Sequence, residues 1–118
     1  MDRAKKAGGS IMVNWDDMVV DKTGKGVHRS IFDRASSQFG KLEMHETTLN
    51  KGEVSHDPHT HRAEELIILK KGEVQMLIGG KFYRGVTGDL FLLNSNVQHG
   101  LINTGGEPCE YFAFQWQN

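Results

Sequence analysis

Short segments bounded by glycine are the feature that most restricts the fold of this chain of 118 residues. From Ile11 onward, glycines separate runs rich in β-branched and aromatic residues, and no run keeps a helical period beyond about two turns. This pattern predicts an all-β fold. The length fits one compact domain. We expect residues 1–10, which are rich in Lys, Ala and Gly, to be a disordered tail and residues 11–118 to be a single domain.

Eight short strands are expected, which suggests two facing sheets or a closed barrel. The clearest hairpin signal is Gly79-Gly80, because a two-residue hairpin turn needs the positive φ that glycine adopts without steric cost. Residues 15–20 are expected to form a turn or a single helical turn. The expected strands are 27–32, 41–49, 65–69, 74–78, 81–84, 90–93, 99–103 and 110–116.

The charge balance gives no sign of a nucleic-acid or membrane partner. Lys and Arg number 14 against 15 Asp and Glu, and the basic residues are scattered. No apolar run approaches the roughly 18 residues that a membrane span needs. Cys109 has no second cysteine for an intrachain disulfide, which favours a reducing compartment and a cytoplasmic protein. The small size favours a homodimer.

Histidines cluster in the middle of the chain. Four of the six fall between residues 45 and 61, three of them in the run His56-Asp57-Pro58-His59-Thr60-His61. On an extended strand, residues two apart point to the same face, so His59 and His61 are expected to present two imidazoles side by side. Such a pair is suited to chelating a metal ion.

Glu65 and His99 are polar residues beside apolar segments. Glu65 precedes the run Leu-Ile-Ile-Leu at 66–69, where burying an unpaired carboxylate would be costly. His99 follows the apolar run 90–93 and opens another expected strand. A cation near Glu65 would remove the cost of burying the carboxylate, and His99 also needs a polar partner.

The spacing of these residues resembles the first motif of the cupin superfamily. That motif is a Gly, a short spacer, His-x-His, three or four residues, Glu, six residues and Gly. The chain matches it with one extra residue between the first glycine and the first histidine. The matching residues are Gly52, His59, His61, Glu65 and Gly72.

The second cupin motif is also matched in spacing, by Gly88, His99 and Asn103. Asn94 and Asn96 stand where the family usually has Pro and Gly. Both replacements favour turns, and Asn tolerates the left-handed backbone region, so the loop before His99 can still form. Neither departure falls on a ligand position.

The resemblance implies a double-stranded β-helix, the jelly-roll barrel of cupins, holding one divalent transition metal ion. It implies His59, His61, Glu65 and His99 as the ligands, with His99 resting chiefly on the second motif. In octahedral geometry these four leave two positions open for water or substrate. Imidazole and carboxylate do not select among Mn, Fe, Ni and Zn. The alternative is a metal-free cupin, in which these same four side chains form hydrogen bonds with one another or with a small ligand.

Four further residues are candidates for the rest of the site. His45 is either a catalytic group facing the barrel interior or a hydrogen-bonded strand histidine. We interpret His56 as a histidine at the pocket rim rather than a fifth ligand. On the last strand, Tyr111 and Gln115 share a face that could reach a substrate pocket, and the alternate row 112, 114 and 116 is expected in the core or a dimer interface.

Two functions fit this candidate site, and each needs a small-molecule ligand. An ion with two open positions can chelate a substrate with neighbouring oxygens, so we favour a metal-dependent enzyme of dioxygenase, isomerase or lyase type. Its substrate would be a small oxygen-rich molecule. The alternative is a non-catalytic binding module for a sugar or small organic acid. The fold itself does not choose between them.

Overall fold

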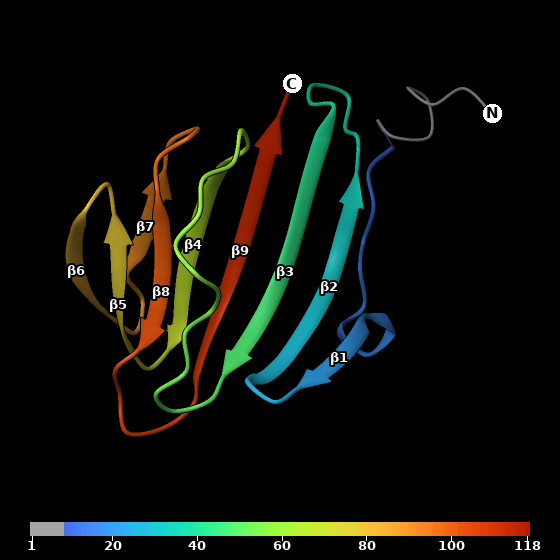
Figure 1. Cartoon of the computed structure of the whole chain (residues 1–118). Helices are drawn as coiled ribbons and strands as arrows, with labels where there is room; N and C mark the ends of the chain where they lie inside the picture. The colour runs from blue at the N-terminus through green and yellow to red at the C-terminus, as the bar shows by residue number, and fades with distance from the viewer. Residues whose placement is uncertain (1–8) are drawn as a thin grey trace.

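The computed structural model describes residues 9–118, which form an almost entirely antiparallel β structure (Figure 1). Residues 1–8 of the expected tail lie outside the described residues. Within 9–118, no helix is long and apolar enough to cross a membrane. One 3-10 helix, η1 (Trp15–Asp17), precedes nine strands. These are β1 (Val19–Thr23), β2 (Gly26–Arg34), β3 (Lys41–Leu49), β4 (Glu64–Lys71), β5 (Glu73–Ile78), β6 (Lys81–Val86), β7 (Leu90–Leu93), β8 (His99–Asn103) and β9 (Cys109–Gln117).

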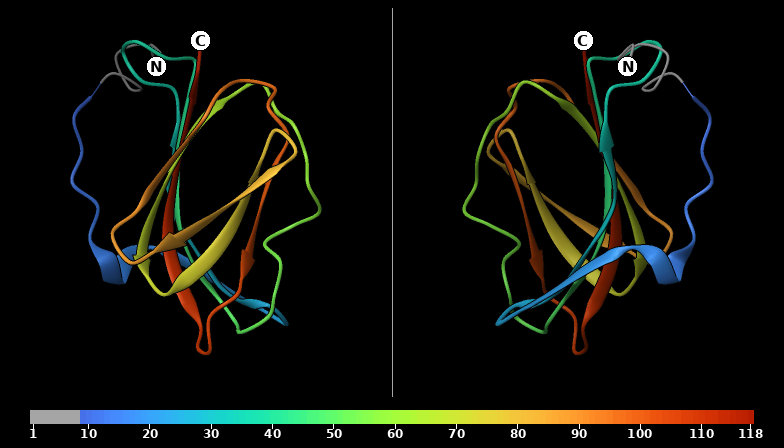
Figure 2. Two further views of the ribbon diagram at one scale, coloured as in Figure 1. Left: turned by 90° about the vertical axis from the view of Figure 1, so that its left-hand side faces the viewer. Right: turned by 90° about the vertical axis from the view of Figure 1, so that its right-hand side faces the viewer.

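The strands form two sheets, which confirms the expected jelly roll. The larger sheet has the order β1-β2-β3-β9-β4-β7 and the smaller has the order β6-β5-β8. The last strand, β9, pairs with both β3 and β4 and so closes the middle of the larger sheet. Figure 2 shows the segment that joins β3 to β4, in green, on one side of this sheet and the N-terminal segment, in blue, on the other.

Alternation along the central strands decides which side chains enter the core. On β4 the buried residues are Glu65, Ile67 and Leu69, each two positions from the next. On β9 the buried row contains Tyr111 and Ala113. The aromatic row at 112, 114 and 116 was expected in the core or in a dimer interface. It is half-buried on the outer face of the sheet and so does not lie in the core. Glu65 therefore shares its face with the hydrophobic core.

The expected strands at 41–49, 90–93 and 99–103 match β3, β7 and β8 in their bounds. The expectation for residues 15–20 is wrong in its second half. Trp15–Asp17 form a single helical turn, but Val19 and Val20 belong to β1, which the sequence did not suggest. All five residues of β1 are exposed, so its sequence lacks the apolar alternation of a half-buried strand.

Backbone geometry explains several of the motif positions. Gly72 has φ 116°, and a Cβ there would come within 2.8 Å of the Cβ of Cys109. Asn96 has φ 62°, so asparagine does adopt the left-handed conformation in the loop before His99. Asn103 is buried, and its amide nitrogen donates to the carbonyl oxygens of Leu49 and Glu107, both at 2.9 Å. These residues hold the loops around the site.

The core should tolerate truncation far less than the sheet surface. Leu69 is fully buried on β4, whereas Phe82 on β6 is 58% exposed. We expect Leu69→Ala to lower the free energy of unfolding by about 2–5 kcal/mol, because it leaves a cavity. Phe82→Ala should change it by less than about 1 kcal/mol. Urea unfolding followed by circular dichroism measures both, and equal losses would contradict this assignment of the core.

Candidate metal centre

The four residues expected as metal ligands come from two neighbouring parts of the fold. His59 and His61 lie in the segment between β3 and β4, Glu65 lies near the start of β4, and His99 is the first residue of β8. His59 forms an isolated antiparallel bridge with His99, in which each backbone N–H donates to the other's carbonyl oxygen at 3.1 and 3.0 Å. This bridge holds the two motifs together.

Two of the histidines converge on one carboxylate oxygen of Glu65. Oε1 of Glu65 lies 3.1 Å from Nε2 of His61 and 3.2 Å from Nε2 of His99. One ligand atom from each of these residues falls within 4.8 Å of the others, an arrangement that can hold a metal ion. His59 belongs to a second such group, with His56 and His99. The structure thus brings the four residues together, while their role as ligands stays a prediction.

The spacing of the imidazole rings suits a shared ion. The ring centroid of His99 lies 4.8 Å from that of His59 and 4.7 Å from that of His61, and the centroids of His59 and His61 are 5.1 Å apart. Two imidazoles bound at right angles to one ion through bonds of about 2.1 Å have centroids about 4.6 Å apart. Small movements would therefore place all three rings around one ion.

Backbone carbonyls fix the protonation of two of these rings. Nδ1 of His61 lies 2.8 Å from the carbonyl oxygen of Ala63, and Nδ1 of His99 lies 2.9 Å from that of Val97. A carbonyl oxygen only accepts hydrogen bonds, so each Nδ1 carries the proton. In the neutral rings each Nε2 then presents a lone pair toward Glu65. Lone pairs that face a carboxylate need a cation between them, either protons or a metal ion.

The charge of Glu65 adds to this need. Burial on its own raises the pKa of Glu65, but contacts with His99 and His61 outweigh burial and the pKa lies below its usual value. Burial and three neighbouring histidines, His56, His99 and His61, lower the pKa of His59, which favours its neutral form. The shifts of Glu65 and His59 therefore favour a charged carboxylate beside a neutral imidazole.

His99 provides a direct test of whether the residues fit a metal ion. Its Nε2 is buried, lies 3.2 Å from Oε1 of Glu65, and has no hydrogen-bond partner beyond this ion-pair contact among the described residues. Burial lowers the pKa of His99, and contacts with Glu65 and the Val97 carbonyl more than offset this, so the pKa is raised. A buried nitrogen that a cation would satisfy fits a metal ligand.

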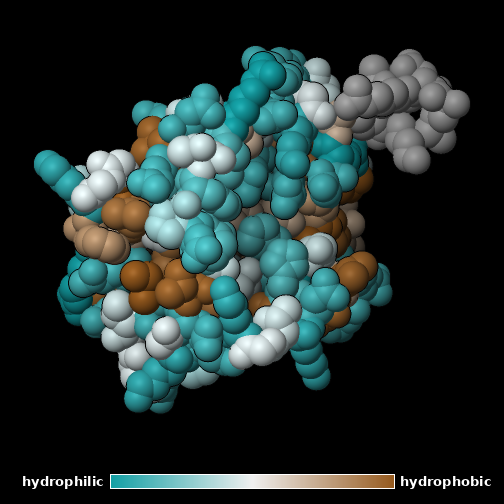
Figure 3. All heavy atoms as spheres, in the orientation of Figure 1, coloured by the Kyte–Doolittle hydropathy of each residue, from teal (hydrophilic) through white to brown (hydrophobic). Residues whose placement is uncertain are grey.

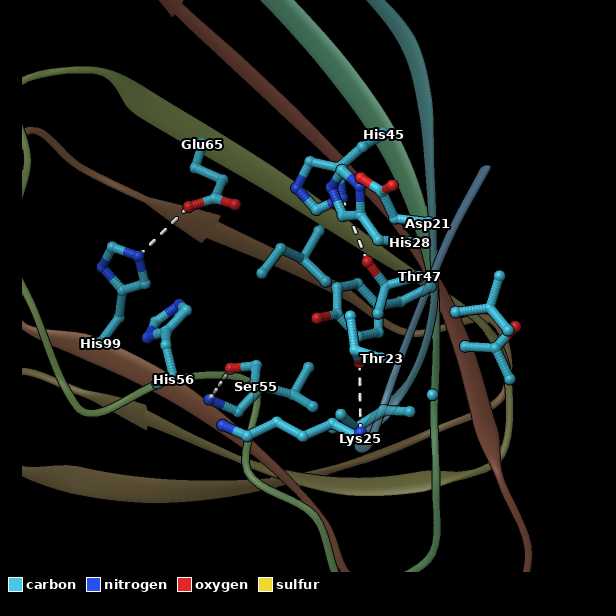
Figure 4. A pocket seen from close by; sticks show the side chains of 18 of the residues that line it. Asp21, Thr23, Lys25, His28, His45, Thr47, Ser55, His56, Glu65 and His99 are labelled. Atoms are coloured by element: carbon cyan, nitrogen blue, oxygen red, sulfur yellow. Dashed lines mark hydrogen bonds and ion pairs between the residues drawn. The ribbon is translucent and has the colours of Figure 1, made fainter. Parts of the chain in front are cut away.

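A cavity of about 670 Å³ opens beside this centre (Figure 4). Glu65, His59 and His99 form part of its wall, and the apolar side chains of Ile67 and Met76 form another part. All four other candidate residues also line it: His45, His56, Tyr111 and Gln115. The structure places these four where their expected roles require, and those roles remain predictions.

His45 lies on the cavity wall formed by the larger sheet. Its Nδ1 is 3.2 Å from Oγ1 of Thr47, and its ring centroid is 4.6 Å from that of His28. Burial, and then the neighbouring His28, lower the pKa of His45, which favours its neutral form. Burial also raises the pKa of Tyr111 to about 12, against an opposing hydrogen bond with Thr47. His45 is thus both hydrogen-bonded and in the cavity, so the two interpretations of this residue are compatible.

The cavity is also lined by residues that the sequence analysis did not predict, among them His28, Lys25 and Ser55. Figure 4 shows His28 beside His45, and the Lys25 side chain extending from the β1–β2 turn toward Ser55. Ser30 on β2 pairs with His45 on β3, and His28 pairs with Thr47, so alternation on β2 places His28 on the inner face. The sequence contains this alternation, but it predicts which face His28 is on only when the register between β2 and β3 is known.

Solved structures of similar fold include an RmlC-like cupin from Shewanella frigidimarina NCIMB 400 and a predicted oxalate decarboxylase from Thermotoga maritima. The first has a TM-score of 0.76 at 16% identity and covers 95% of each chain. The second has a TM-score of 0.72 at 19% identity and covers 92% of this chain and 100% of the other. At these identities the likeness concerns the fold alone.

Curated relatives include the HTH-type transcriptional regulator PuuR of Escherichia coli strain K12, and a protein of the same name in Shigella flexneri. Each is 24% identical over 103 residues, which cover 87% of this chain and 55% of the relative. The chain therefore spans about half the length of the curated relatives it matches.

The family is shown by a match that contains both motifs. Residues 45–114, more than half of the chain, match the Cupin_2 family, whose description is cupin domain. The match begins at His45 and includes the four expected ligands. On this basis the chain belongs to the cupin family.

Proposed function

We propose that this cupin is a metal-dependent enzyme that acts on a small oxygen-rich molecule bound in its cavity. One observation carries the proposal: the group of His61, Glu65 and His99, with ligand atoms within 4.8 Å, adjoins a cavity of about 670 Å³. His45 lines the same cavity. A centre that can hold a metal ion, a space for a substrate and a titratable side chain are the parts such an enzyme needs.

Each protein group has a defined task in this proposal. His59, His61, Glu65 and His99 would hold one divalent ion, which could be Mn, Fe, Ni or Zn. When bound, the ion supplies Lewis acidity and a position at which substrate oxygens are oriented. The neutral ring of His45 accepts or returns a proton on the substrate. Tyr111 and Gln115 shape the wall on which the substrate rests.

The charges and apolar groups of the cavity indicate what substrate would fit. Lys25 on the β1–β2 turn contributes an ammonium group, and Asp21 on β1 contributes a carboxylate (Figure 4). Apolar side chains, including Ile67, Met76 and Leu101, line the deeper wall. We therefore favour a small acid with oxygens at the metal end and a short apolar part between them and Lys25. A reaction of dioxygenase, isomerase or lyase type suits such a molecule.

A second candidate function is a non-catalytic ligand-binding module. The observation that favours it is the likeness to PuuR, which is named a transcriptional regulator. In that role, the same cavity would bind a sugar or small organic acid without converting it. The two candidates differ in a measurable property, because only the enzyme turns its ligand over.

The outer face of the larger sheet supports the proposal that the protein is a homodimer. Leu90 and Leu92 on β7 are 60% and 61% exposed and pair with Ile68 and Leu66 on β4. Phe114 on β9 continues this apolar row. The face of the molecule drawn in Figure 3 is mostly hydrophilic, with smaller apolar patches between the polar side chains. A second copy would cover the apolar row. We also propose a cytoplasmic location, as expected from the cysteine content.

Elemental analysis tests the metal centre. Protein purified without added metal should contain about one transition metal ion per chain, and His61→Ala should lose it, because Nε2 of His61 faces Glu65. The fold should remain, since it depends on the apolar core, and circular dichroism checks this. Lys81→Ala, a change on exposed β6, is the control that should keep the metal. A wild-type protein without stoichiometric metal would refute the proposal.

Turnover assays separate the enzyme from the binding module. Metal-loaded protein is offered catechols, thiols, diketones and small hydroxy or keto acids, and oxygen consumption and product formation are followed. For an accepted substrate, His45→Gln should lower kcat by about 10²–10⁴-fold while metal content stays the same. His28→Gln, a matched change of the neighbouring ring, should lower it less. Ligand-induced thermal stabilisation with no turnover would favour the binding module instead.

Light scattering during size-exclusion chromatography tests the dimer. The wild-type chain should elute with twice its mass of 13.2 kDa, and Leu92→Glu should shift it toward the monomer because a charge would be buried in the interface. Phe82→Glu, a matched change at an exposed residue of the smaller sheet, should leave the mass unchanged. A monomeric wild-type chain would contradict the proposal.

A further inference from the structure

His56 lies outside the residues that match the cupin motifs, yet it touches the centre. Its ring stacks on that of His59 with centroids 3.7 Å apart and planes inclined by 16°. It also meets the ring of His99 edge-on, with centroids 6.0 Å apart. Ligand atoms of His56, His59 and His99 fall within 4.8 Å of one another. His56 is thus in contact with two of the imidazoles of the centre.

The ring of His56 is prepared for a ligand role in the same way as those of His61 and His99. Its Nδ1 lies 2.8 Å from the carbonyl oxygen of Asp57. That oxygen can only accept, so Nδ1 carries the proton and Nε2 of the neutral ring keeps its lone pair. Metal-binding histidines typically have their other nitrogen fixed by such a partner. A histidine that merely borders the cavity needs no such fixation.

The backbone holds His56 in place from both sides. The N–H of Ser55 donates to the carbonyl oxygen of Leu101 at 2.9 Å, and His59 is bridged to His99. Between these anchors the segment lies against Gly100, where a Cβ would be 3.6 Å from Pro58 and 3.7 Å from the His56 carbonyl oxygen. The segment therefore rests on β8 along its length, and His56 is held beside His99.

The stacked rings of His56 and His59 lie too close together for both to bind one ion at right angles. Their 3.7 Å separation is shorter than the roughly 4.6 Å expected for two imidazoles bound at right angles to one ion. His99 belongs to both groups of candidate ligands, and its Nδ1 is already engaged by Val97, so only Nε2 can bind an ion. The two groups consequently describe one centre with a surplus imidazole, rather than two separate metal sites.

We propose that His56 is an alternative metal ligand, which takes the place of His59 beside His61, Glu65 and His99. This inference rests on the metal binding in the proposed function. Exchange between the stacked rings keeps the number of protein ligands constant while it changes which side of the ion faces the cavity. The group bound at this site is the divalent ion itself, and Zn²⁺, Co²⁺ and Cu²⁺ serve as probes.

A double-mutant cycle on metal affinity tests the exchange. The affinity for Zn²⁺ is measured by competition with a chromogenic chelator, in the full-length chain. The wild type, His56→Gln, His59→Gln and the double variant are compared. If either ring can serve, each single change should cost less than about tenfold, and the double change should cost at least about tenfold more than the product of the single losses. His28→Gln, a cavity histidine outside the centre, is the matched control and should keep the wild-type affinity.

A spectroscopic count of imidazoles gives an independent measure that does not require the double variant to fold. Pulsed electron paramagnetic resonance of the Co²⁺- or Cu²⁺-loaded protein counts the bound imidazoles. His59→Gln should show the same number as the wild type, because His56 replaces the lost ring. The role of His56 would be overturned if His59→Gln bound one imidazole fewer than the wild type. It would also be overturned if the loss of Zn²⁺ affinity in the double variant equalled the product of the two single losses. A wild type that binds no metal would overturn the proposed function as well, so the two failures are distinguishable.

Discussion

The buried carboxylate of Glu65 is the constraint around which the centre is arranged. Glu65 is 5% exposed on a strand whose other inward residues are Ile67 and Leu69, and a lone charge there would be costly. Imidazoles approach it from two directions, one from the segment before β4 and one from β8. Since neutral imidazoles offer lone pairs, they do not neutralise the carboxylate by themselves. A proton on one of the imidazoles or a metal ion would complete the charge balance, so the proposed metal centre is compatible with how the core is built.

Orientation in this site comes from the backbone. The carbonyl oxygens of Asp57, Ala63 and Val97 each engage the Nδ1 of a nearby histidine, and each lies within two residues of the histidine it orients. Local chain geometry therefore fixes the tautomers, whatever happens at distant positions. The orientation of the histidine rings can then be kept while other parts of the jelly roll vary, which is one reason a single fold can host different chemistry.

The fold was largely predictable because turns and strands are signalled locally. Gly79 and Gly80 both adopt positive φ, and the strand bounds at 41–49, 90–93 and 99–103 follow from the residues between such turns. The first strand was not predictable in this way. It is exposed along its whole length and owes its conformation to pairing with β2. A strand formed by a neighbour's hydrogen bonds carries little apolar pattern of its own.

The candidate site was predictable where chemistry and spacing coincide, and not where it depends on contacts across the sheets. His59, His61 and Glu65 stand out by spacing, whereas His28 enters the cavity only through the register of β2 against β3. His56 shows the same limit. Its position before Pro58 suggested a rim residue, and its stacking on His59 and its contact with the Asp57 carbonyl, on which the proposed ligand role rests, are visible only in the structure. Whether His56 could serve as a ligand thus depends on tertiary placement, because spacing along the chain does not tell which rings lie close enough to share an ion.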